Sequence, residues 1–165
     1  MNMSESERKV LKPPTQGKPF PWHCTECGGK EVYPATVSHT SRIRLDGITY
    51  SVELPELRIP KCRVCGELVF DNDAEEQITQ ALREQLGLLS PVEIRKNRDE
   101  LRLSQRQLAE QLGVAVETIS RWENGLMIQT RAMDRFMRLF FSVPEARAAL
   151  VGSALLPSLG THVQS

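Results

Sequence analysis

Hydrophobic and polar residues alternate along residues 41–54, and the alternation is interrupted once. Ile43 and Leu45 form the first apolar series, and a second series runs through Ile48, Tyr50, Val52 and Leu54. A period of two predicts β-strands that bury one face. The interruption is Asp46-Gly47, a dipeptide preferred in two-residue type I′ hairpin turns. The pattern therefore predicts a β-hairpin within a strand-rich segment over residues 22–72.

A helical period replaces the alternation after residue 72. Ile78, Leu82 and Leu86 recur at helical spacing behind an acidic first turn, which suits the helix dipole. This spacing predicts a linker helix within residues 73–90. From residue 91 to residue 141 the pattern stays helical, with short turns. We therefore predict an α+β chain in which a small β domain precedes an all-α domain over residues 91–151.

The two ends of the chain show neither the strand period of two nor the helical period. Residues 1–21 are polar and contain four prolines, which predicts a disordered lead-in. Residues 152–165 are predicted to form a flexible tail. Between them, the segment from Pro144 to Leu156 is apolar enough for one more helix, which would pack either on its own domain or on a dimer partner.

The charge of the chain does not indicate a general polyanion binder. Its 21 basic and 21 acidic residues give a formal net charge of zero. Residues 91–141 carry nine basic and seven acidic side chains, a balance of only +2, whereas residues 73–90 carry one and four, a balance of −3. No run of about 18 apolar residues occurs, and the amino end has no apolar signal segment. A soluble, cytoplasmic protein without a membrane span is expected.

All four cysteines lie in two C-x-x-C pairs with 34 residues between them. In the cytoplasm such pairs are more often metal ligands or redox centres than disulfides. A hairpin that joins the pairs would bring four thiolates into one tetrahedral site, as in structural zinc centres. We predict one structural Zn²⁺ per chain; a redox pair and an iron–sulfur cluster remain alternatives. The predicted ligands are Cys24, Cys27, Cys62 and Cys65.

The sequence does not favour an enzyme. Four sulfur ligands close the shell of a tetrahedral metal ion, and no convergent base or nucleophile is visible. His23, His39 and His162 are expected at the surface or near the site, not as ligands. A zinc hydrolase or a thiol redox protein is the alternative in this class.

The segment "LSQRQLAEQLGVAVETISRWENG" predicts two helices joined by a tight turn. Ser104 and Gln107 match a capping box, Gly113 supplies the turn, and Ala115 leaves the second helix without a polar cap. The residues expected in the core are Leu108, Ala109, Leu112, Val114, Ile119 and Trp122. The exposed face of the second helix then carries short or polar groups that can reach base edges in a major groove. These are Val116, Glu117, Thr118, Ser120, Arg121 and Asn124.

The stretch from Pro91 to Phe141 resembles the Xre and Cro/C1-type helix-turn-helix domains. The resemblance implies five helices, which would start near Pro91, Ser104, Ala115, Thr130 and Val143. Together with the preceding C-x-x-C hairpin, residues 22–142 resemble the MqsA (YgiT-type) antitoxins of bacterial toxin–antitoxin pairs. That resemblance implies a zinc domain that binds a toxin, and a helix-turn-helix domain that dimerises and represses the operon at a palindromic operator. A stand-alone zinc-containing Xre-family regulator without a toxin is the alternative.

The same resemblance suggests which residues contact DNA. Glu117 and Arg121 occupy the positions of the family's main base-reading pair. Arg121 can bond guanine, although a phosphate contact or an ion pair with Glu117 would also account for it. Glu117 can accept from cytosine or sit near a helix amino terminus. Gln105 is expected to touch phosphate, and Arg106 and Arg131 are either further backbone contacts or solvated.

Overall fold

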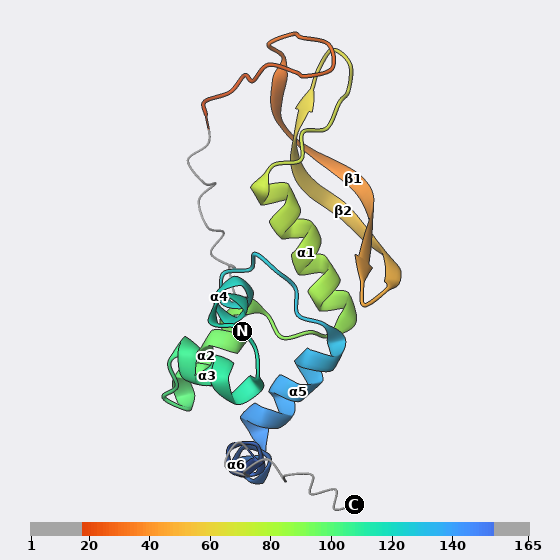
Figure 1. The fold of residues 1–165 in the computed structure, drawn as a ribbon. Coiled ribbons are helices and arrows are strands. Elements are labelled where there is room, and N and C mark those ends of the chain that lie inside the picture. Colours follow the sequence, from red (N-terminus) through yellow and green to blue (C-terminus); the bar gives the residue numbers. More distant parts are fainter. Residues whose placement is uncertain (1–17, 154–165) are drawn as a thin grey trace, which may run out of the picture. The chain divides into compact units, whose positions relative to one another are not determined.

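A computed structural model describes residues 18–153 of the chain (Figure 1). The first seventeen residues of the predicted lead-in and residues 154–165 of the predicted tail, which include His162, lie outside the described residues. The described chain forms two compact units. The first contains residues 18–39 and 54–77, and the second contains residues 40–53 and 78–153.

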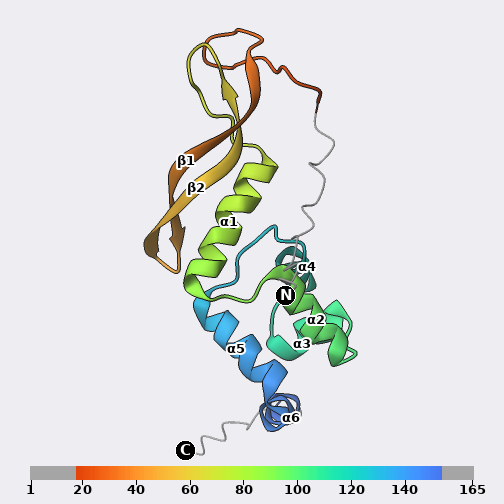
Figure 2. The ribbon, with the colours of Figure 1, turned by 180° about the vertical axis from the view of Figure 1, so that it is seen from behind.

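The predicted hairpin is present. β1 (Val32–Leu45) and β2 (Ile48–Cys62) pair as an antiparallel two-stranded sheet, seen as one long twisted ribbon in Figures 1 and 2. Asp46 and Gly47 connect them with φ angles of 53° and 76°. A type I′ turn requires positive φ at both central residues, so the turn prediction is confirmed.

The buried side chains of β2 change phase twice along the strand, after Leu54 and again at Pro60, from which Pro60 and Cys62 are buried. Val52 and Leu54 are buried in the first half, whereas Leu57 and Ile59 are buried in the second. Because side chains alternate with a period of two, each shift of one residue moves the buried series to the opposite face of the strand. In the first unit Gln77 of the following helix is hydrogen-bonded to the backbone of β2. Its side-chain amide donates to Arg58 O at 2.9 Å and accepts from Arg58 N at 3.0 Å.

Six helices follow the hairpin within residues 18–153, and the predicted α+β class is confirmed. α1 (Asn72–Leu86) corresponds to the predicted linker helix. The next five begin within one residue of the predicted starts. They are α2 (Pro91–Glu100), α3 (Gln105–Leu112), α4 (Val116–Glu123), α5 (Arg131–Ser142) and α6 (Pro144–Ser153). None of the described helices is both long and apolar enough to cross a membrane.

Local capping explains where these helices begin. Ser90 with Glu93 and Ser104 with Gln107 form complete capping boxes at α2 and α3. The box at α3 was predicted and is confirmed; the box at α2 was not predicted. Thr130 caps α5 through its hydroxyl, which accepts from Met133 N at 3.1 Å. α4 is different, since Ala115 has an extended backbone at the cap position and makes no side-chain hydrogen bond there.

One apolar core holds the helical part of the second unit together. It contains every residue predicted for it, with Val114 half-buried at its edge. The buried members are Leu89, Ile94, Leu108, Ala109, Leu112, Ile119, Trp122, Met137 and Phe140. Gly113 ends α3 in the left-handed region (φ 70°), which makes the tight turn into α4 possible.

The hairpin turn also belongs to the second unit. The Asp46 carboxylate accepts a 2.8 Å hydrogen bond from Arg131 N and lies 3.6 Å from Arg131 Nε. An anionic group at the first residue of α5 suits the helix dipole. The contact joins residues 85 positions apart in the sequence.

Candidate metal centre and nucleic-acid interface

The two C-x-x-C pairs form turns with the same backbone hydrogen bonds. In the first, Cys24 N donates to Gly29 O at 2.8 Å and Gly28 N donates to Cys24 O at 2.9 Å. In the second, Cys62 N donates to Glu67 O at 2.8 Å and Gly66 N donates to Cys62 O at 3.0 Å. Both closing glycines have positive φ, which side chains other than glycine rarely adopt. We call these turns the first and the second knuckle.

The knuckles bring all four predicted cysteines together. Their sulfurs lie within 4.8 Å of one another, with Cys24 Sγ 3.5 Å from Cys65 Sγ and Cys27 Sγ 3.7 Å from Cys62 Sγ. None of the four forms a disulfide. The first cysteine of each knuckle is buried beside Val32, whereas the second is exposed. The four thiols could therefore bind one metal ion, held between the hairpin's open end and the preceding loop.

The surrounding backbone affects how readily the thiols ionise. Hydrogen bonds from backbone N–H groups, first that of Cys65, lower the pKa of Cys62 to about 7 against the opposing effect of desolvation. At Cys65 the N–H of Glu67 favours the thiolate, but desolvation and the thiol of Cys24 outweigh it and raise the pKa to about 12. Metal ligation requires thiolates, so an entering ion must displace protons and will bind more tightly as the pH rises.

The helix predicted to enter the major groove has the expected two faces. Ile119 and Trp122 are buried in the core, and the predicted contact residues lie on the opposite side. Of these, Val116, Glu117, Arg121 and Asn124 are exposed, and Thr118 and Ser120 are half-buried.

The side chains of Arg121 and Glu117 have no hydrogen-bond or ion-pair partner in the described part of the chain. The predicted alternative of an ion pair between them is therefore absent from this structure. Arg106, in contrast, pairs with Glu110 at 3.2 Å. Arg121 thus presents a free guanidinium fork, the donor arrangement that binds guanine or phosphate.

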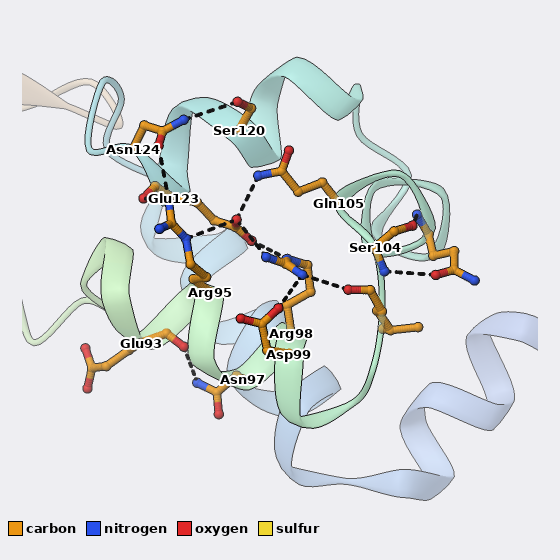
Figure 3. A network of polar contacts seen from close by, with 12 residues as sticks. Glu93, Arg95, Asn97, Arg98, Asp99, Ser104, Gln105, Ser120, Glu123 and Asn124 are labelled. Atoms are coloured by element: carbon orange, nitrogen blue, oxygen red, sulfur yellow. Dashed lines mark hydrogen bonds and ion pairs between the residues drawn. The ribbon is translucent and has the colours of Figure 1, made fainter.

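The last residue of this helix, Glu123, carries a buried carboxylate that the sequence analysis missed. Glu123, whose side chain has no solvent exposure, accepts from Arg98 Nε at 2.5 Å and from Arg98 Nη2 at 3.1 Å (Figure 3). Gln105 Nε2 donates to the same carboxylate at 2.8 Å, and Arg95 Nε lies 3.7 Å away. The network ties α2 and the first residue of α3 to the last residue of α4. It therefore fixes the position of the helix that carries Arg121.

The partners of Glu123 keep it ionised. Burial by itself would raise the pKa of the carboxyl, but the hydrogen bonds from Arg98 and Gln105 and the arginine charges outweigh burial, so the pKa lies below its ordinary value. The pKa of Arg98 is raised, mainly by its hydrogen bonds to Glu123. A buried charge is tolerated only when it is paired and hydrogen-bonded in this way.

Three predicted contact residues, Gln105, Ser120 and Asn124, also form hydrogen bonds in or beside this network. The side-chain amide of Gln105 is bound to Glu123, which leaves its backbone N–H at the start of α3 as the group suited to phosphate. Asn124 donates to Ser120 Oγ at 3.3 Å and accepts from Arg95 Nη2 at 3.2 Å (Figure 3). Their contacts with DNA remain predictions.

Residues 94–139 match the family described as helix-turn-helix. The match begins in α2, ends in α5 and contains both α3 and α4. No curated protein matches the chain. The helix-turn-helix match supports a DNA-binding transcriptional regulator.

Proposed function

We propose that this protein is the antitoxin of a type II toxin–antitoxin pair. In this proposal the hairpin with its cysteine centre neutralises a toxin, and the helix-turn-helix represses the protein's own operon. The observation that carries the proposal is the presence, in one chain, of a four-cysteine hairpin centre followed by a helix-turn-helix. This is the combination on which the resemblance to MqsA-type antitoxins rests.

Zinc is the ion we propose for the cysteine centre. Zn–S bonds of about 2.3 Å in tetrahedral geometry separate neighbouring sulfurs by about 3.8 Å. The separations of 3.5 and 3.7 Å are close to that value. A cluster of several irons would require the sulfurs to stand farther apart, because the irons lie between them. Four sulfurs leave no open position on the ion, so we propose a structural role and no catalysis.

For DNA, we propose that two copies bind a palindromic operator. Residues 91–141 have a balance of only +2, so the non-specific attraction of one domain to phosphate is modest. Binding two half-sites at once compensates for this, as in helix-turn-helix dimers whose half-sites lie about 34–36 Å apart. Arg121 is the residue we propose for direct base contact.

Co-expression tests both parts of the proposal. The chain would be produced with the product of the reading frame adjoining its gene, purified through a tag on that product, and mixed with DNA from upstream of the gene. We expect a stable complex, about one zinc per chain by elemental analysis, and a shifted DNA band that a scrambled sequence of equal length does not give.

Each negative result of this experiment rejects a different part of the proposal. A DNA complex without co-purification of any adjoining product would leave the stand-alone regulator. Loss of the specific DNA complex would remove the repressor role, and a preparation of the full chain without bound metal would remove the zinc centre.

A further inference from the structure

The two knuckles have matching backbones but different tips. The tip of the first knuckle is Thr25-Glu26, which is polar and acidic, whereas that of the second is Arg63-Val64, which is basic and apolar. The two closing hydrogen bonds and the closing glycines are the same in both knuckles, and the one additional bond, from Arg63 N to Glu31 O, uses only the backbone. The fold of a knuckle therefore does not require the side chains of an arginine and a valine at these positions. The side chains of Arg63 and Val64 therefore serve some purpose other than forming the turn.

Val64 has no packing role that would account for it. Its exposed fraction is 69%, the highest among the large hydrophobic residues described in the first unit. A single exposed valine is unremarkable on a protein surface. This one, however, lines a hollow of about 520 Å³ beside the metal centre. The hollow is also lined by Tyr33, Pro34, Ala35, Lys61, Cys62, Arg63, Cys65 and Gly66.

The cations of the hollow are available to a ligand. The first unit has eight acidic and five basic residues among those described, yet neither Lys61 nor Arg63 forms an ion pair with the described residues. The Arg63 guanidinium lies 3.8 Å from the centroid of the Tyr33 ring. This stacking orients the planar group while leaving its N–H donors free, and such a fork binds a carboxylate through two parallel hydrogen bonds.

We propose that the hollow beside the second knuckle is the surface that grips the protein partner, and that the partner inserts an apolar side chain flanked by a carboxylate. The apolar side chain would cover Val64, Pro34 and Ala35, and the carboxylate would bind Arg63 and Lys61. This inference rests on the proposed toxin partner and identifies where on the hairpin unit that partner is held.

A protein fits this surface better than a nucleic acid does. Single-stranded nucleic acids bind to open aromatic faces on which bases can stack, along a groove of positive charge. Here Arg63 covers the face of Tyr33, and Pro34, Ala35 and Val64 line the same hollow with apolar side chains. An apolar centre with charged residues at its rim is the usual composition of a protein–protein contact.

The test replaces the tip residues of the second knuckle with residues of the kind found in the first. The double variant Arg63→Thr, Val64→Glu gives the second knuckle the tip residues that the first already carries on the same backbone, so the metal centre should be retained. Thr25→Ala, Glu26→Ala is the matched control at the first knuckle. For each full-length chain one would measure zinc content, affinity for the adjoining gene's product by calorimetry, and affinity for upstream DNA.

We expect the second-knuckle variant to keep its zinc and its DNA affinity but to bind the product on the order of 100-fold more weakly. The first-knuckle control should bind within about threefold of the unaltered chain. Equal binding by the unaltered chain and the second-knuckle variant would overturn the inference and leave the antitoxin proposal intact. A parallel loss of DNA affinity would show that the hollow meets nucleic acid, which also overturns it. Absence of binding by the unaltered chain would reject the toxin partner and this surface together.

Discussion

Arg121 and Arg106 show how differently two exposed arginines can be placed for binding DNA. Arg106 is held 3.2 Å from Glu110 and would have to give up that pair, at least in part, to contact DNA. Arg121 has no such partner among the described residues, so its donors are available without a rearrangement. The absence of a competing carboxylate strengthens the assignment of base contact to Arg121 on α4.

Replacing Arg121 with Ala should relax sequence preference more than it weakens DNA binding in general. A bidentate contact to guanine discriminates by about 1–3 kcal/mol, whereas a phosphate contact adds equally to all sequences. Arg121→Lys is the control, since it keeps the charge but lacks the planar fork. Fluorescence anisotropy with operator and scrambled duplexes at one salt concentration would measure both affinities. An equal loss on the two duplexes would identify Arg121 as a phosphate contact.

Glu123 should contribute more to stability than any exposed carboxylate of the domain. Glu123→Gln leaves Arg98, whose side chain is only 12% exposed, without its charged partner. Removing one member of a buried pair typically costs about 3–5 kcal/mol, and we expect a loss near the lower end because the amide oxygen still accepts. Urea unfolding followed by circular dichroism would measure it. Glu117→Gln, on the exposed face, should change stability by less than about 0.5 kcal/mol.

The lowered pKa of Glu123 also gives this contribution a pH dependence. A depressed folded-state pKa means that the unfolded chain takes up the proton more readily. The stabilisation is therefore fully present above the unfolded value of about 4.3 and is lost as the pH falls through the lower, folded value. Glu123→Gln should show a flatter fall in unfolding free energy over that acidic range. Identical slopes for both proteins would contradict an ionised, paired carboxylate.

The sequence could not reveal this network. Glu123 follows a buried tryptophan at the end of a short helix, a place where a glutamate is usually solvated. Its partner Arg98 is 25 positions earlier and belongs to a run of charged residues that resembles an exposed face. Only the packing of α2 against α4 brings the two together. The cysteines, in contrast, were predictable because their spacing by itself restricts where their sulfurs can lie.

At the scale of the elements, α4 starts without the side-chain cap that α2, α3 and α5 have. Ala115 has the extended backbone of a capping residue, φ −70° and ψ 147°, but has no side chain that can accept a hydrogen bond. Ala115→Ser should therefore stabilise the helical domain by about 1 kcal/mol, since the hydroxyl can accept from an unpaired N–H of the first turn. Thermal unfolding would show a higher midpoint, and Ala115→Val is a control without an acceptor. No difference between the two variants would mean that water already satisfies these groups.

Helix starts and the hairpin turn followed from the sequence because each depends on a few adjacent residues. Ser104 with Gln107, and Asp46 with Gly47, specify their geometry within four positions. The first change of phase in β2, after Leu54, was not predicted. It depends on which side chains the rest of the chain covers, and the alternation before Pro55 gives no sign that it will shift.

At the scale of the whole molecule, the metal and the DNA-binding core should be separable. The cysteine centre and the helical core are built from different residues, and no cysteine lies in the helical core. Chelation, or Cys62→Ser, should abolish binding of a toxin while residues 91–142 stay folded. Hydrogen exchange of the full chain with and without chelator would show loss of protection at the knuckles and retention in α2 to α5. Loss of protection throughout would show that the ion stabilises the entire chain.

The contact between Asp46 and α5 matters for anyone who wishes to label this protein. The tip of a two-residue hairpin is ordinarily among the safest sites for an inserted epitope or fluorophore. Here the tip residue accepts a hydrogen bond from the first residue of a helix in the DNA-binding domain. A reporter inserted between Asp46 and Gly47 would displace that carboxylate and disturb the very domain it was meant to observe.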